Sequence, residues 1–199
     1  MQPEQTKQRI LAAAAELFGE LGFDATSTRD IAARSGVNKA LLHYHFGSKD
    51  ELLAALLDGY YGALTTTLAA AWRQRAHPAE QVQDVVDAYA DFLAEHRAFC
   101  AIVHREVASG RHVEQIVART LSVLELRIGW FGEGPTAELM QILTSVYGMV
   151  VTYFTYGPVL ARLTGADPFA ADALQARKRH VRRIVALLFA EMAPDAKGT

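Results

Sequence analysis

Residues 10–53 read ILAAAAELFGELGFDATSTRDIAARSGVNKALLHYHFGSKDELL, and this stretch decides the fold. Its first part places Ile10, Leu17 and Leu21 at helical spacing, so these side chains share one face of a helix. Gly22 follows directly and can cap the C-terminus, because glycine adopts a left-handed backbone conformation without steric cost. The stretch therefore opens with an amphipathic helix.

The next part has the pattern of a short, capped helix over residues 27–33. Ser27 and Asp30 have capping-box spacing, in which each side chain accepts a hydrogen bond from a backbone N–H of the first turn. Gly36 can end this helix with left-handed geometry. The pattern therefore predicts a tight turn at Ser35-Gly36-Val37.

A third short helix is predicted over residues 39–45, because Asn38 can cap its N-terminus. A helix of barely two turns does not persist alone in water, so tertiary contacts must hold it. Ile31 and Leu42 can supply those contacts across the turn, which leaves the opposite face to solvent. Three short helices joined by tight turns predict a helix-turn-helix, whose outward candidates include Lys39, Leu41, His43 and Tyr44.

Residues 10–53 resemble the DNA-binding domain of the tetracycline-repressor (TetR) family, with glycines, caps and aromatic residues in register. The resemblance implies an all-α fold of about nine helices, a homodimer, and paired recognition helices that bind operator DNA. It also implies a ligand-responsive transcriptional repressor, released from a near-palindromic operator by a small molecule, with no cofactor and no catalytic residue.

The resemblance, read residue by residue, gives the predicted DNA-binding set. Its members are Ser27, Thr28, Arg29, Lys39, Ala40, Leu41, His43, Tyr44 and Lys49. Arg29 and the two lysines can neutralise phosphates, which positions a protein on DNA without reading the sequence. Apolar Ala40 and Leu41 can contact thymine methyl groups in the major groove.

The recognition helix departs from the family pattern at two places. Ala40 and Leu41 stand where many relatives have glycine and threonine, and His43 stands where they have a phosphate-contacting tyrosine. Tyr44 follows His43 directly and offers an aromatic hydroxyl one position later. The base sequence of the operator therefore does not follow from the resemblance.

Helical periodicity continues through the rest of the chain, with no alternating run long enough to require a strand. We expect a DNA-binding three-helix bundle at residues 1–50 and a helical ligand-binding and dimerisation domain at residues 51–199. The nine predicted helices span about residues 6–21, 27–33, 39–45, 48–75, 79–95, 98–109, 112–131, 136–163 and 170–192, the eighth with a kink near Pro158.

Composition excludes several classes of protein. The chain has 199 residues, 51% of them hydrophobic, which is ample for a packed core. Its net charge of −2 argues against indiscriminate binding of nucleic acid, although residues 26–49 carry four cations and one acidic side chain. A single cysteine excludes an intramolecular disulfide and a multi-thiolate zinc site. The N-terminus lacks signal-peptide features, which predicts a cytoplasmic protein.

Residues 139–161 hold no charged side chain and are long enough to span a bilayer. Polar residues and the Gly157-Pro158 break favour instead a helix buried in the core or in a dimer interface. The last two predicted helices are too apolar for a monomer surface and contain the small residues Gly148 and Gly157. We therefore expect a homodimer formed through these helices as a four-helix bundle.

Aromatic and polar side chains of the C-terminal domain are candidates to line a cavity for the effector. The predicted ligand-binding residues are Tyr61, Tyr89, Phe92, Phe99, His104, Tyr147 and Tyr153. They offer many rings and hydroxyl groups but few charges. The expected effector is therefore an uncharged or weakly polar, aromatic small molecule.

Two other classes of function compete with this interpretation. Cys100 and His104 share a helical face and could form a thiolate–imidazole dyad in a small enzyme, although no orienting third group lies near in the sequence. A helical scaffold that binds only protein is the second alternative. The basic run at residues 177–183 could bind nucleic acid or lipid, but we interpret it as a solvated helix face.

Overall fold

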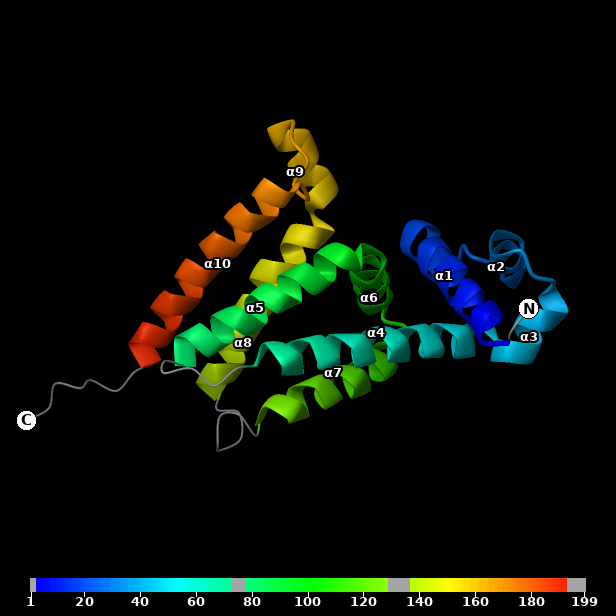
Figure 1. The fold of residues 1–199 in the computed structure, drawn as a ribbon, viewed down its shortest axis with the longest axis horizontal. Helices are drawn as coiled ribbons and strands as arrows, with labels where there is room; N and C mark the ends of the chain where they lie inside the picture. Colours follow the sequence, from blue (N-terminus) through cyan, green and yellow to red (C-terminus); the bar gives the residue numbers. More distant parts are fainter. Residues whose placement is uncertain (1–2, 73–77, 129–136, 193–199) are drawn as a thin grey trace, which may run out of the picture. The chain divides into compact units, whose positions relative to one another are not determined.

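The computed structural model describes residues 3–72, 78–128 and 137–192, which form ten helices and contain no strand (Figure 1). The helices are α1 (Pro3–Leu21), α2 (Thr28–Ser35), α3 (Lys39–Phe46), α4 (Lys49–Ala71), α5 (Pro78–Glu95), α6 (Arg97–Ser109), α7 (Val113–Ile128), α8 (Ala137–Thr155), α9 (Gly157–Thr164) and α10 (Ala171–Met192). The all-α prediction is confirmed. The predicted ends of the fourth and seventh helices, near residues 75 and 131, lie outside the described residues.

The chain divides into two compact units. Unit 1 comprises Met1–Ala63 and His96–Leu124, and unit 2 comprises Leu64–Glu95 and Glu125–Thr199. In unit 1, α6 packs closely against α1, so that a Cβ added at Gly19 would lie 3.1 Å from the Cβ of Ala98. Residues 97–124 therefore pack with the N-terminal helices, whereas the sequence prediction had grouped them with the rest of residues 51–199.

Unit 1 has a continuous apolar core supplied by α1, α2, α3, α4 and α6. The largest side chains with almost no solvent exposure are Ile10, Phe18, Ile31, Leu42, Leu52, Leu53, Leu57 and Ile102. Ile31 and Leu42 come from the two helices of the helix-turn-helix, and both are buried as predicted. Burial of these apolar groups is the main source of free energy that holds the short helices together.

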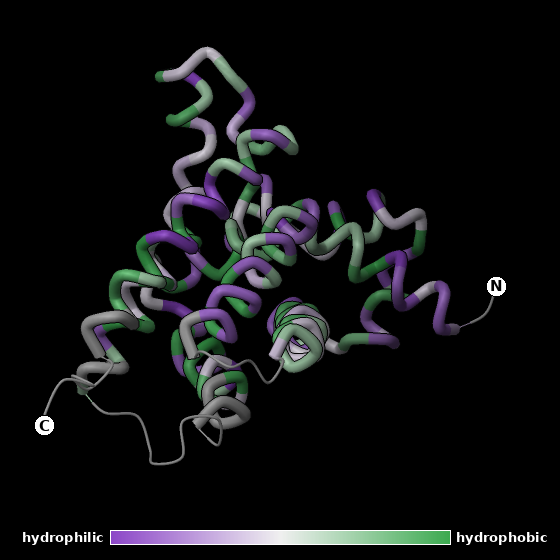
Figure 2. Tube along the Cα trace, turned by 60° about the vertical axis from the view of Figure 1, so that its left-hand side comes forward, coloured by the Kyte–Doolittle hydropathy of each residue, from purple (hydrophilic) through white to green (hydrophobic). Residues whose placement is uncertain are grey.

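Unit 2 is built on mutual packing of α5, α8 and α10. Its core includes Val86 and Leu93 of α5, Val150 of α8, and Val181 and Val185 of α10, all buried. Each helix thus buries one apolar stripe and leaves its polar face outward, as expected for amphipathic helices. Figure 2 shows hydrophilic and hydrophobic residues alternating along the tubes of these helices.

Part of the basic run of α10 packs against neighbouring helices, so the prediction of a solvated face is wrong for Arg177 and Lys178, whereas Arg182 is exposed as predicted. Lys178 forms an ion pair with Asp91 of α5 at 2.7 Å, and Arg182 pairs with Asp87 of α5 at 2.5 Å. Arg177 donates to the backbone carbonyl of Met149 in α8 at 2.6 Å. Long cationic side chains can cover apolar surface with their stems while the charged ends find partners, which periodicity alone does not show.

The predicted eighth helix, at residues 136–163, is two helices. α8 ends at Thr155, and α9 begins at Gly157 with Pro158 in its first turn. Proline is well suited to the first turn of a helix, where its missing N–H is not needed, and this accounts for the tenth helix. Gly157 is buried under the ring of Phe169, which stacks on Phe154 at 5.7 Å. The small residue at position 157 thus serves packing within the chain.

The uncharged segment at residues 139–161 is divided by this break. Within the part of the chain that the structure describes, no helix is long and apolar enough to cross a membrane.

We predict that Gly157→Ala destabilises the protein. A Cβ at this position would overlap the ring of Phe169, so the ring or the start of α9 must shift. The free energy of unfolding should fall by about 1–3 kcal/mol, measured by urea denaturation. Gly59→Ala is the matched control, because an added Cβ there meets no atom within 4 Å. The Gly59→Ala change should raise the free energy of unfolding by up to about 1 kcal/mol. An unaltered urea midpoint for Gly157→Ala would contradict the packing of Gly157 against Phe169.

Candidate nucleic-acid interface

The capping box at the start of α2 is confirmed in both directions. The hydroxyl of Ser27 accepts from the backbone N–H of Asp30 at 3.2 Å, and the carboxylate of Asp30 accepts from the backbone N–H of Ser27 at 3.0 Å. Hydrogen bonds from Ser27 to the ionised carboxylate hold the pKa of Asp30 below its usual value. The first turn of α2, with Thr28 and the exposed side chain of Arg29, is therefore fixed in place.

The turn between α2 and α3 is fixed from α1. Gly36 adopts a φ of 66°, the left-handed conformation that the sequence predicted. Nη2 of Arg9 in α1 donates to the carbonyl of Ser35 at 2.5 Å and lies 3.4 Å from that of Gly36. A guanidinium at the C-terminus of α2 also compensates the partial negative charge of that helix end. Sequence analysis missed Arg9, because its partners lie 26 and 27 residues away.

The third helix presents one face to solvent. Asn38 caps it by accepting from the N–H of Leu41 at 2.7 Å, while Leu42 and Phe46 are buried. Tyr44 points outward with 82% of its surface exposed, which is unusual for a large aromatic residue. The predicted residues Lys39, Ala40 and His43 are also exposed, and Leu41 is partly exposed.

Lys49, predicted to face phosphate, has two partners within the protein. Its Nζ donates to the carbonyls of Phe23 at 2.8 Å and Thr26 at 3.0 Å, and lies 4.1 Å from the centre of the Phe23 ring. The hydroxyl of buried Thr26 donates to the carbonyl of Gly22 at 2.8 Å. Lys49 thereby holds the loop that leads into α2. An ammonium group has three N–H donors, so one remains for a phosphate.

The predicted ligand-binding residues of unit 1 do not form one site. Tyr61 and Phe99 are buried with their rings edge to face at 5.2 Å, and the hydroxyl of Tyr61 lies 3.3 Å from that of Thr120. Burial raises the pKa of the Tyr61 hydroxyl. His104, in contrast, is exposed on α6. The first two residues belong to the core, and the third faces water.

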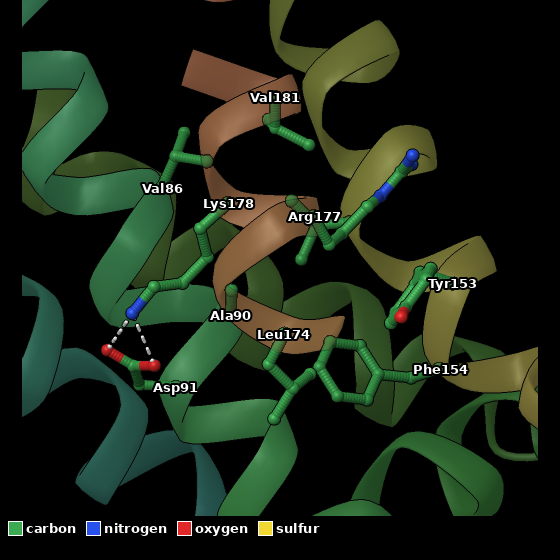
Figure 3. A pocket seen from close by; sticks show the side chains of 10 residues that line it. Val86, Ala90, Asp91, Tyr153, Phe154, Leu174, Arg177, Lys178 and Val181 are labelled. Carbon is green, nitrogen blue, oxygen red and sulfur yellow. Dashed lines mark hydrogen bonds and ion pairs between the residues drawn. The ribbon is translucent and has the colours of Figure 1, made fainter. Parts of the chain in front are cut away.

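The remaining predicted ligand-binding residues lie in unit 2. Tyr89 of α5 and Tyr147 of α8 stack with ring centres 6.4 Å apart, and Tyr147 is half exposed. Phe92 is buried in α5. Tyr153 lines a cavity of about 10 Å³, which is space for about one water molecule (Figure 3).

The cavity around Tyr153 is formed by α5, α8 and α10. Figure 3 shows its apolar wall and the ion pair between Lys178 and Asp91 beside it. The residues that line it are Val86, Ala90, Asp91, Val150, Tyr153, Phe154, Leu174, Arg177, Lys178 and Val181. Of the seven predicted ligand-binding residues, this cavity contains Tyr153.

The geometry does not support a dyad of Cys100 and His104. Cys100 is buried, and burial raises the pKa of its thiol to about 11, so the thiol is protonated at neutral pH. His104 faces solvent on the same helix. Within residues 3–72, 78–128 and 137–192, no cluster of three or more histidine, cysteine or acidic side chains is arranged to hold a metal ion.

A capped helix-turn-helix with an outward, partly aromatic recognition face defines a DNA-binding transcriptional regulator. Comparison with known proteins gives the family. The family described as bacterial regulatory proteins, tetR family, matches residues 10–56. The HTH-type transcriptional repressor Rv3405c of Mycobacterium tuberculosis is 32% identical over 174 residues, covering 86% of this chain and 84% of that protein. The chain therefore belongs to the TetR family of transcriptional regulators, and it is not an enzyme.

Solved structures agree with the fold. The ketosteroid transcriptional regulator KstR2 of Mycobacterium tuberculosis superimposes with a TM-score of 0.66 at 22% identity, covering 90% of this chain and 93% of that chain. The fatty acid degradation regulator FadR of Bacillus halodurans gives a TM-score of 0.68 at 13% identity, covering 98% of this chain and 97% of that chain. At these identities the likeness extends to the fold alone.

Proposed function

We propose that this regulator is a repressor that binds a near-palindromic operator as a homodimer and leaves it when a small molecule binds. The observation that carries the proposal is the exposed face of α3, with Tyr44 outward and Leu42 buried. An exposed aromatic side chain on a short, rigid helix has no role in the core and fits the major groove. Binding of chromosomal DNA also requires the cytoplasm, where we propose that the protein acts.

We propose the following contacts with DNA. Arg29, Lys39 and the remaining N–H of Lys49 bind phosphates, while Ser27 and Thr28 bind the backbone near the start of α2. Ala40 and Leu41 contact thymine methyl groups, and His43 and Tyr44 complete the recognition face. Exposure of Arg29, Lys39 and Tyr44 supports these roles.

We propose that the dimer forms through α8 and α10 with help from α9. These three helices, together with Tyr156 between α8 and α9, carry exposed apolar side chains that a monomer would leave in water. Those in the helices are Met140, Tyr147, Val159, Leu163 and Leu187. Leu163 and Leu187 are 78% and 62% exposed, respectively. An accumulation of large exposed apolar groups is typical of a protein interface.

We propose an apolar, weakly polar or aromatic effector. In unit 2, the stacked pair Tyr89–Tyr147 offers rings and hydroxyl groups for such a molecule. The described cavity near Tyr153 holds about one water, so an effector must open space between helices. KstR2 of Mycobacterium tuberculosis is 31% identical over 53% of this chain and is described as a ketosteroid transcriptional regulator, a name that supports an apolar effector.

We propose that α4 transmits effector binding to the DNA-binding helices and so causes release of the operator. Lys49 at its start holds the loop before α2, and its last residues, from Leu64 to Ala71, belong to unit 2. An effector that displaces the far end of α4 would move the near end and change the separation of the recognition helices. Linkage then requires operator DNA to weaken effector binding by the same factor, typically about 5- to 150-fold.

The phosphate contact of Lys39 can be tested by the salt dependence of binding. Lys39→Ala should weaken binding to a duplex selected from random DNA and lower the slope of log K against log salt by about one, because one phosphate contact is lost. Arg105→Ala removes an exposed cation from α6, outside the proposed DNA contacts and the proposed dimer interface, and should change neither quantity. A Lys39 variant with an unaltered slope would reject the phosphate contact.

Dimerisation can be tested with one charge in the proposed interface. Leu187→Glu should weaken the dimer at least about tenfold, because a carboxylate would be buried without a partner. Light scattering across micromolar concentrations measures the effect. Leu121→Glu on α7 is the matched control, since Leu121 is 50% exposed but lies outside the proposed interface. A monomeric wild-type protein, or a Leu187→Glu dimer as tight as wild type, would contradict this interface.

A further inference from the structure

A strained histidine lies at the corner between α6 and α7. His112 has a φ of 52°, and among the described residues it is the single non-glycine residue with a positive φ. Side chains rarely adopt this conformation, which persists only when surrounding contacts favour it. Its side chain is 11% exposed, so these contacts are extensive. The corner is therefore held in a conformation that the backbone alone disfavours.

Both ring nitrogens of His112 face carboxylates. Nδ1 lies 2.7 Å from Oε2 of Glu106 in α6, and Nε2 lies 3.2 Å from Oδ1 of Asp50 in α4. A carboxylate oxygen accepts hydrogen bonds, so each carboxylate is a partner for one ring nitrogen of His112. Glu106 is 3% exposed, and a buried carboxylate requires a cationic or hydrogen-bonding partner. We name these three residues the His112 bridge.

The same ring contacts the loop that leads into α2. Its centre lies 4.7 Å from that of Phe23 in an edge-to-face arrangement. The ammonium group of Lys49 lies over the ring of Phe23, 4.1 Å from the ring centre. The same ammonium group donates a hydrogen bond to the backbone carbonyl of Phe23. Lys49 donates as well to Thr26, the residue before the capping serine of α2. Contacts thus run without a gap from the α6–α7 corner to the first turn of α2.

We infer that His112 is a positioning residue for DNA binding. Through its contacts with Phe23 and Asp50 it fixes the loop before α2 and the start of α4, and so fixes the N-terminus of α2. The inference rests on the DNA contacts proposed above, and it goes beyond them because His112 is not among the residues proposed to contact DNA. The strained backbone at position 112 is maintained for this placement.

A purely stabilising role accounts poorly for the arrangement. Asp50 is 66% exposed, and an exposed ion pair contributes little to stability because water screens it. The cost of the positive φ at His112 opposes that gain. Asp50→Asn should therefore leave the melting temperature almost unaltered and still disturb the position of the DNA-binding residues.

The test measures operator affinity of the full-length protein by fluorescence anisotropy, on a duplex selected from random DNA by the wild type. His112→Asn and Asp50→Asn should each weaken binding about 5- to 20-fold. Asparagine suits position 112 because it tolerates a positive φ. The double variant should bind no more weakly than the weaker single variant, because both changes remove one bridge.

Glu114→Gln is the matched control. Like Asp50, Glu114 is an exposed carboxylate in the first turn of a helix, so its loss should not alter affinity. Thermal melts of each variant show that the protein is folded at the temperature of the assay. The Asp50 variant keeps the test valid even if the change at His112 impairs folding.

A conservative variant separates positioning from packing. Asp50→Glu keeps a carboxylate in the first turn of α4 that can accept from Nε2 of His112. Its operator affinity should therefore lie closer to that of wild type than the affinity of Asp50→Asn does.

The outcomes separate this inference from the proposed function. If the wild type binds DNA and both His112→Asn and Asp50→Asn bind it with unaltered affinity, the role of His112 alone would be overturned. The same holds if Asp50→Glu binds as weakly as Asp50→Asn. Failure of the wild type to select any DNA sequence would overturn the proposed function and this inference with it.

Discussion

The eight-residue recognition helix α3 is too short to persist alone, and the rest of unit 1 depends on this constraint. The helix is held by burial of Leu42 and Phe46, by the cap from Asn38, and by the turn that Arg9 holds from α1. Each of these contacts fixes one end or the buried face of α3, and the opposite face of α3 stays exposed to solvent. The exposed face can therefore be varied for DNA recognition without loss of the fold.

The two units use charge in different ways. In unit 1, cations bind backbone carbonyls at helix ends and in a loop, as Arg9 and Lys49 do, and so determine the backbone geometry next to the recognition surface. In unit 2, Lys178 and Arg182 pair with acidic side chains across two packed helices, which fixes the register of α10 on α5. α4 belongs to both units, which makes it the natural element through which one could affect the other.

Local signals in the sequence predicted most of the DNA-binding unit. Both ends of α2 and the burial of Ile31 and Leu42 depend on residues within a few positions of one another, and the structure has them as predicted. The hydrogen bonds of Arg9 with Ser35, of Lys49 with Thr26 and of His112 with Asp50 join residues 23 to 62 positions apart, so no local pattern indicates them. The full break between α8 and α9 depends on the packing of Gly157 against Phe169, which the sequence does not reveal. The effector site depends on the distances between helices, and hydrophobic periodicity does not contain those distances.

Hydrogen exchange tests most directly whether α2 and α3 form the recognition surface. Full-length protein would be compared with and without a duplex that it has selected from random DNA, and protection of backbone amides would be followed by mass spectrometry. The account predicts added protection in residues 27–46 when DNA binds, because this segment contains the start of α2 and all of α3. Added protection confined to residues 137–192, or none in residues 27–46, would contradict it.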